Sequence, residues 1–111
     1  MRILLRTAAY DVFVASLPEQ VKKKLDYVTN ILINRTVINT KFVKKLENTP
    51  FYEMRISMGN EYRVILLAVD NTSIIEAKLV IMLNGFVKKS TKDYSAQIQL
   101  ANNILQSLSE E

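Results

Sequence analysis

The fold is decided by residues 51–70, FYEMRISMGNEYRVILLAVD. Apolar and polar side chains alternate over residues 52–58, which is the pattern of a strand with one buried and one polar face. Gly59–Asn60 then marks a turn. Residues 62–70 are apolar on both faces except at Arg63, which is typical of a central strand. The stretch therefore predicts an antiparallel hairpin.

A third strand and a final helix are expected after this hairpin. Asp70–Ser73 has turn composition, and Ile74–Leu83 reads as a strand that ends at Asn84–Gly85. Residues 95–108 carry apolar side chains at helical spacing. The C-terminal part of the chain is therefore expected to be an amphipathic helix.

The part of the chain that precedes the hairpin is predicted to be mostly helical. Residues 2–6 are short, apolar and compatible with a strand, and residues 8–17 read as a helix. Pro18 suits the first turn of a second helix, whose apolar side chains over 21–32 share one face. Residues 41–46 are predicted to form a short third helix. The inward stripe of the first helix is expected to comprise Ala9, Val12, Phe13 and Leu17.

This order of elements predicts the α+β class. An N-terminal strand and a helical hairpin should pack on an antiparallel sheet, followed by a C-terminal helix. With 111 residues, 49% of them hydrophobic, the chain is expected to form one domain over residues 1–111.

Composition excludes several kinds of chemistry. The sequence has no cysteine and no histidine, which removes disulfides, thiolate or imidazole metal sites and histidine-dependent triads. Its two glycines are isolated and cannot form a phosphate-binding loop. The start MRILLRTAAYD is charged too early for a signal peptide, and no apolar run is long enough to cross a membrane. We therefore expect a cytoplasmic protein without a metal or another cofactor.

The charge distribution favours a polyanionic partner. Lys and Arg number 15 against 11 Asp and Glu, giving a formal charge of +4. Three of the lysines fall within residues 88–92, and Arg55 and Arg63 flank the predicted hairpin turn, whereas the acidic residues are scattered. We expect these cations to form a basic surface that binds RNA phosphates. The lysines at 22–24 lie off the apolar stripe of their helix and are expected to be solvated.

Whether Arg55 and Arg63 act together depends on the register of the hairpin. A strict two-residue loop at Gly59–Asn60 would put the two arginines on opposite faces, whereas a loop of three or five residues, or a bulge, would align them. In the alternative interpretation they are unrelated surface residues paired with Glu53 and Glu61, which contributes little stability. The sequence leaves both interpretations open.

Read together and in order, four pieces of sequence resemble the RelE/HigB superfamily of toxin ribonucleases, most closely its phage-derived HigB-like branch. These pieces are YEMRI (52–56), EYRVILLAVD (61–70), LNGFVKKSTKDY (83–94) and AQIQLA (96–101). The resemblance implies a RelE-like fold and a metal-independent endoribonuclease that cleaves messenger RNA on the ribosome and inhibits translation. It also implies a cognate antitoxin as partner.

The resemblance also implies roles for individual residues. Arg55 and Arg63 match strand residues that contact the scissile phosphate, and Lys88 matches a basic residue at the start of the following turn. Tyr94 matches a tyrosine that stacks on or activates the RNA. Further RNA contacts are expected from Lys89, Lys92 and Glu53.

The general base is left open between two residues. Glu53 stands where some relatives have a lysine, and Tyr94 is the other candidate. Nearby cations are expected to lower the pKa values of tyrosine and lysine in such a site.

Two other functions remain compatible with the sequence. One is a toxin of the same fold that inhibits DNA gyrase without cutting RNA, as the ParE relatives do. The other is a module without catalytic activity that binds RNA or another protein through the basic surface. The basic turn at 88–92 favours RNA over gyrase.

Overall fold

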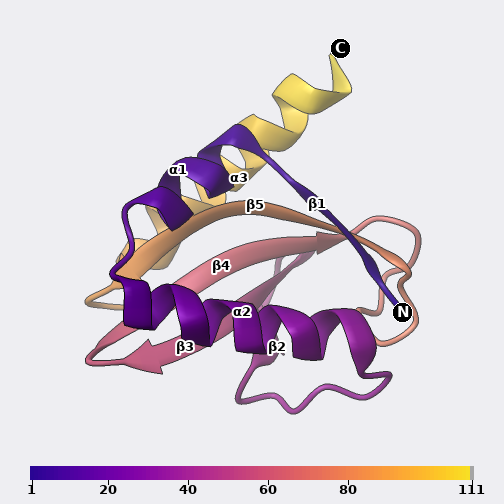
Figure 1. The fold of residues 1–111 in the computed structure, drawn as a ribbon. Coiled ribbons are helices and arrows are strands. Elements are labelled where there is room, and N and C mark those ends of the chain that lie inside the picture. Colours follow the sequence, from indigo (N-terminus) through magenta and orange to yellow (C-terminus); the bar gives the residue numbers. More distant parts are fainter. Residues whose placement is uncertain (111) are drawn as a thin grey trace.

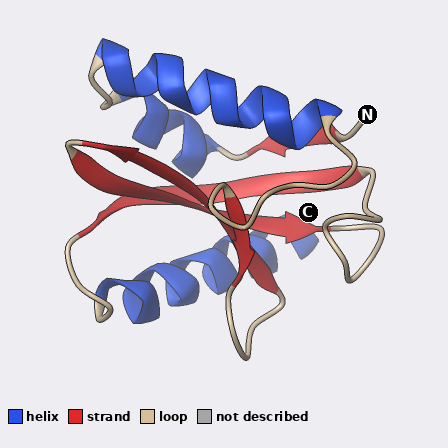
Figure 2. Ribbon diagram, turned by 90° about the horizontal axis from the view of Figure 1, so that it is seen from below, coloured by secondary structure: helices blue, strands red, loops and turns tan. Residues whose placement is uncertain are grey.

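Five strands form one sheet with helices on both faces, in a computed structural model that describes residues 1–110. Helices α1 and α2 cover one face and α3 covers the other (Figures 1 and 2). The elements in chain order are β1 (Ile3–Arg6), α1 (Ala8–Ala15), α2 (Glu19–Asn34), β2 (Val43–Lys45), β3 (Phe51–Met58), β4 (Asn60–Ala68), β5 (Leu79–Lys88) and α3 (Asp93–Ser109). The predicted α+β class is confirmed. No helix within residues 1–110 is long and apolar enough to span a membrane.

The strand order is β1-β5-β4-β3-β2, so β4 is the middle strand, as its apolar sequence predicted. The sheet is not wholly antiparallel, however, because β1 pairs with β5 in parallel. These two strands are far apart in the sequence, and helices lie between them. A tight turn therefore does not impose an antiparallel orientation on this pair.

Burial confirms the apolar stripe of α2 and corrects that of α1. Val28 and Leu32 of α2 are fully buried, but Val12 of α1 is 72% exposed and Tyr10 is buried in its place. A helix turns by about 100° per residue, so Val12 lies roughly 200° around the helix from Tyr10. Since Tyr10 faces the sheet, Val12 faces away from it.

The predicted third helix at 41–46 is wrong, because this segment contains the edge strand β2. Val43 of β2 pairs with Met54 of β3. Asn39 accepts a hydrogen bond from the backbone N–H of Lys41 at 2.9 Å, so its side chain supports a turn before the strand and not a helix cap. The buried, β-branched Val43 fits a pleated surface better than a helix.

The last strand lies further along the chain than predicted. The expected strand was 74–83, whereas β5 runs from Leu79 to Lys88 and includes Asn84 and Gly85. Gly85 does not end the strand, because its role is to make room for a side chain of α1. A Cβ atom at this position would lie 2.3 Å from the ring of Phe13.

The N-terminus is held in place by Arg2, a buried side chain that is 6% exposed. Its guanidinium donates hydrogen bonds to five backbone carbonyls, three at the end of α2 and two in the segment between β4 and β5. The acceptors are Leu32, Arg35, Thr36, Ile74 and Ile75. Burial lowers the pKa of this side chain. Arg2 thus joins three segments that are distant in sequence.

Replacing Arg2 by Met is expected to lower the free energy of unfolding by about 2–4 kcal/mol, because buried carbonyls would lose their donor. Urea denaturation measures this change. The matched control is Arg6→Met, since the Arg6 side chain is 63% exposed and its pair with Asp11 is worth less than about 1 kcal/mol. Equal stability of the two variants would contradict the role given to Arg2.

Candidate active site

The turn between β3 and β4 sets the register of the candidate site. Met58 pairs with Asn60, so Gly59 alone lies between the strands, with a φ of 73° that favours glycine. Met58, Gly59 and Asn60 together make a loop of three residues, which is an odd number. As a result Arg55 and Arg63 lie directly opposite each other and on one face of the sheet.

A row of side chains crosses three strands on the face that α3 covers. Arg55 pairs with Arg63, and Arg63 pairs with Phe86 of β5. In the next row toward the turn, Glu61 pairs with Lys88. The sheet therefore gathers residues from β3, β4 and β5 beside the start of α3 (Figure 1).

Arg63 is buried, with 2% of its surface exposed, and its donors are used inside the protein. Its Nε donates to the Tyr94 hydroxyl at 3.2 Å, and Nη1 donates to the Tyr62 carbonyl at 3.0 Å. Its Nη2 lies 3.3 Å from a carboxylate oxygen of Glu61. The central position of β4 and the cover of α3 account for this burial, so Arg63 is not part of the exposed basic surface.

Glu53 lies inside the protein against both arginines. It is 3% exposed, and its Oε1 lies 3.3 Å from Nε of Arg55 and 3.8 Å from Nε of Arg63. Its Oε2 has no hydrogen-bond partner among the described residues. A carboxylate between two guanidinium groups offsets their repulsion, so Glu53 holds the two arginines together.

Both ion pairs of the alternative interpretation are therefore present, Arg55 with Glu53 and Arg63 with Glu61. They are not independent surface pairs, because one carboxylate serves two arginines. Sequence spacing gave no sign that Arg63 would be enclosed.

Tyr94 lies between an aromatic ring and a cation. Its ring meets that of Phe86 edge to face at 5.6 Å, and Nζ of Lys88 lies 5.5 Å from its centroid. Burial raises the pKa of Tyr94 from its usual value of 10.0, and the Glu53 carboxylate raises it further. Arg63 lowers the pKa of Tyr94, as expected of a nearby cation, but burial and Glu53 outweigh it, so the expected net decrease is wrong. Tyr94 therefore keeps its proton at neutral pH and is suited to donate it.

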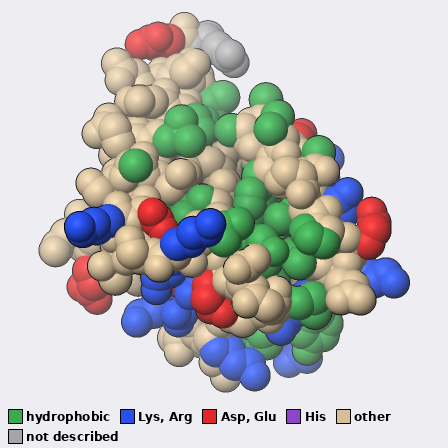
Figure 3. Space-filling model, turned by 90° about the vertical axis from the view of Figure 1, so that its left-hand side faces the viewer, with side chains coloured by type: hydrophobic (Ala, Val, Ile, Leu, Met, Phe, Trp, Pro, Cys, Tyr) green, Lys and Arg blue, Asp and Glu red, His purple; other side chains and the backbone are tan. Residues whose placement is uncertain are grey.

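The turn after β5 carries the exposed cations of the site. Asp93 fixes this turn, since its carboxylate accepts hydrogen bonds from the backbone N–H groups of Lys89 at 2.7 Å and Ser90 at 2.9 Å. These bonds lower the pKa of Asp93. At this end of the molecule, Lys and Arg side chains gather below a hydrophobic area (Figure 3). The cations of the site that solvent reaches are Arg55, Lys88, Lys89 and Lys92.

Sequence reasoning missed one buried polar residue near this row. Asn84 pairs with Ile65 and donates from Nδ2 to the carbonyl of Gln97 at 3.2 Å and to its Oε1 at 3.1 Å. It therefore holds α3 over the sheet. A polar residue within an apolar strand was the available signal, but Asn84 was assigned to a turn.

The fold is that of the RelE toxins. The chain is similar to free E. coli RelE carrying two arginine-to-alanine mutations, with a TM-score of 0.64 and 16% identity over 88% of this chain and 95% of that one. It is also similar to a chain of the E. coli RelBE toxin-antitoxin complex, with a TM-score of 0.63 and 15% identity. That match covers 81% of this chain and 100% of the other. For a chain of the RelB-RelE complex of Methanococcus jannaschii the TM-score is 0.57, with 21% identity. That match covers 81% of this chain and 96% of the other.

Family membership follows from the sequence. Residues 13–106 match the family described as "Phage derived protein Gp49-like (DUF891)". The chain therefore belongs to this phage-derived Gp49-like family. No curated protein sequence matches the chain significantly. The predicted resemblance to the RelE/HigB superfamily is confirmed.

Replacing Glu53 by Gln is expected to lower the free energy of unfolding by about 2–4 kcal/mol, since Arg63 would lose a charge partner within the protein. Chemical denaturation measures the loss. Glu61→Gln is the control, and because the Glu61 side chain is 48% exposed its change should stay below about 1 kcal/mol. A Glu53 variant as stable as this control would show that the carboxylate does not hold the arginines.

The raised pKa of Tyr94 is testable by spectrophotometric titration. The difference between wild type and Tyr94→Phe should show one tyrosine that ionises with a midpoint above pH 10, its usual pKa. The stability that depends on the protonated hydroxyl should be complete below pH 10 and decline as the pH rises above that value. A midpoint below pH 10 would mean that the nearby cations outweigh burial and Glu53.

Proposed function

We propose that this protein is the toxin of a toxin-antitoxin pair and acts as an endoribonuclease on messenger RNA bound to the ribosome. The observation that carries the proposal is the row of Arg55 and Arg63, with Lys88 and Tyr94 beside it, on a RelE fold. Arginine suits this task because its planar guanidinium binds two phosphate oxygens at once and keeps its charge.

In the proposed reaction a ribose 2′-oxygen attacks the adjacent phosphorus, and the bond from phosphorus to the 5′-oxygen breaks. The products are a 2′,3′-cyclic phosphate and a 5′-hydroxyl. Negative charge develops on the phosphoryl oxygens, where Arg55 and Lys88 are the cations that solvent reaches. Arg63 stays inside and holds the Tyr94 hydroxyl from below.

Tyr94 and Glu53 are assigned the two proton transfers. Tyr94 keeps its proton and supplies it to the leaving 5′-oxygen. Glu53 accepts the proton of the 2′-hydroxyl. Its Oε2 has no partner among residues 1–110, and a phosphate bound to Arg55 would compete with Glu53 for that guanidinium and free the carboxylate.

The proposed partners follow from the activity. Two of the similar structures, E. coli RelBE and Methanococcus jannaschii RelB-RelE, are toxin-antitoxin complexes. An unrestrained enzyme that cuts messages would stop growth, so we propose a cognate antitoxin for this protein as well. Ribosomes that carry messenger RNA are the proposed target, which places the activity in the cytoplasm.

Arg55→Ala is expected to reduce cleavage of translated messages by about a hundred- to thousandfold, because a preorganised donor to the phosphoryl oxygens is lost. Purified ribosomes programmed with a defined message provide the assay, and induced expression without an antitoxin reports growth arrest. Arg55→Lys should retain part of the activity, since the charge remains but the bidentate geometry does not.

Arg55 is preferred to Arg63 for this test because Arg63 is buried and its loss would also affect folding. Lys78→Ala, an exposed substitution outside the site, serves as the control. Full cleavage and growth arrest by Arg55→Ala would refute the site. Growth arrest with inhibited DNA supercoiling and intact messages would instead identify a gyrase inhibitor.

A further inference from the structure

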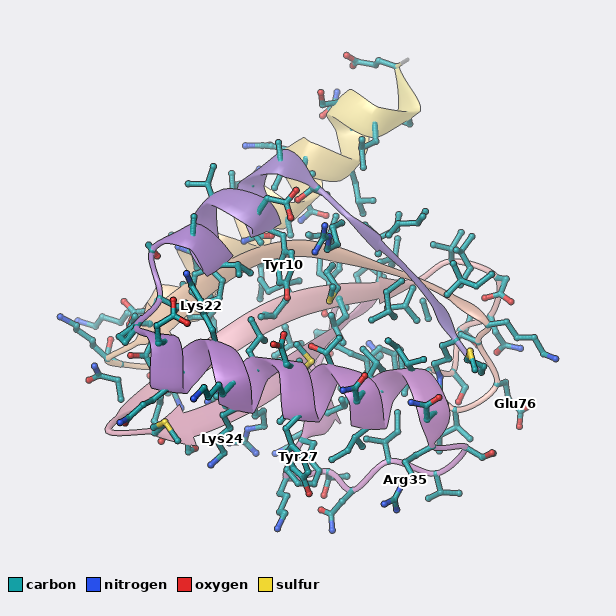
Figure 4. The ribbon with its side chains drawn as sticks, in the orientation of Figure 1. Tyr10, Lys22, Lys24, Tyr27, Arg35 and Glu76 are labelled. Atoms are coloured by element: carbon teal, nitrogen blue, oxygen red, sulfur yellow. The ribbon has the colours of Figure 1, made fainter. Side chains whose placement is uncertain are left out.

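The outer side of α2 carries an exposed aromatic ring between two hollows. Tyr27 is 58% exposed and lines both of them. One hollow of about 590 Å³ extends to Met58 at the hairpin turn, and the other, of about 470 Å³, extends to Phe42. Lys24, Tyr27 and Arg35 lie on the same side of α2 (Figure 4). We call this surface the α2 strip, defined by Tyr27, Phe42 and Met58 with Lys23, Lys24, Arg35 and Lys41.

The charged residues of the α2 strip are all basic. Among residues 1–110, no Asp or Glu lines either hollow. Lys24 donates to the carbonyl of Ser57 at 2.6 Å, which ties the strip to the end of β3. The lysines at 22–24 were expected to form only a solvated helix face, but Lys24 is half-buried and bonded to the hairpin.

The exposed ring of Tyr27 has an aromatic neighbour in the strip. The Tyr27 ring meets the ring of Phe42 edge to face at 6.3 Å, and Nζ of Lys41 lies 5.0 Å from the Phe42 centroid. A ring that meets a neighbour only at its edge keeps its face available for stacking on a base.

Single-stranded RNA matches this combination of groups. Its bases stack on exposed aromatic rings in a sequence-tolerant way, and its phosphates bind lysine and arginine side chains. From Lys24 to Arg35 the helix rises by about 16 Å, enough for a few nucleotides. An acidic protein segment would satisfy the cations but would make no specific use of the open ring face.

The strip is also connected to the candidate active site. Along this edge the backbone of β3 is bonded as far as Arg55, whose N–H donates to the carbonyl of Phe42 at 2.7 Å, so within residues 1–110 no strand pairs with the edge between Arg55 and the turn. Arg55 lies on one face of β3, and the α2 strip begins at Met58 on the other side of the same strand end. An RNA strand that leaves Arg55 can therefore pass the open edge and reach Tyr27.

We infer that the α2 strip is a second RNA-binding site, which holds single-stranded nucleotides flanking the phosphate that is cut. This inference rests on the proposed function for the identity of the strand. It adds a surface on the opposite side of the sheet from the residues that act on the phosphate.

The test is fluorescence anisotropy of the full-length protein with a labelled oligouridylate of about 12 nucleotides. Tyr27→Ala should weaken binding by roughly fivefold to a hundredfold, the range measured for loss of one stacking contact. Tyr27→Phe should bind as wild type because the ring face is kept. Lys23→Ala should weaken binding and reduce its salt dependence, whereas the exposed Lys78→Ala should do neither.

Equal affinities of Tyr27→Ala, Lys23→Ala and Lys78→Ala would overturn the inference. It would also be overturned if an amphipathic acidic peptide bound in a Tyr27-dependent way and the oligouridylate did not, since the strip would then be a protein interface. The measurement does not need cleavage. If the wild-type protein cuts no message but Tyr27→Ala still loses oligouridylate binding, the strip is an RNA site and only the proposed function fails.

Discussion

The arrangement of the site depends on one carboxylate held between two guanidinium groups. The hairpin register places Arg55 directly opposite Arg63, where their charges repel each other. Glu53 offsets this repulsion by meeting both through Oε1, and it can do so only because it lies on the same face of β3. A change of one residue in the turn would reverse the face of every side chain on one strand relative to the other.

The remainder of the fold supports this contact. Arg2 closes the far end of the molecule by joining the N-terminus to the end of α2 and to the segment before β5. At the near end α3 brings Tyr94 onto Arg63 and covers the central strand. The result is one enclosed arginine that positions the site and one half-exposed arginine that can meet a ligand. This division of roles explains how a protein can carry two adjacent arginines on a stable sheet.

Sequence patterns predicted the long elements well, because α2, β3, β4 and α3 have apolar periodicities that tertiary contacts reinforce. They failed at β2, a short segment that takes its structure from pairing with β3, and at the start of β5, which is fixed by pairing with β1 as well as with β4. The pattern did not predict how far the residues proposed for the site are buried. Arg63 and Glu53 are enclosed by α3 and by neighbouring strands, which local sequence does not encode. The sign of the Tyr94 pKa shift was missed for the same reason, since it depends on burial and on Glu53.

We propose that this protein cuts messenger RNA on the ribosome through transesterification. The most direct measurement is to map and chemically identify the RNA ends formed when the wild-type protein is added to a translated message and to the same message without ribosomes. Ribosome-dependent transesterification should give new 5′-hydroxyl ends only in the translated sample. No new ends in either sample, or 5′-phosphate ends, would contradict it.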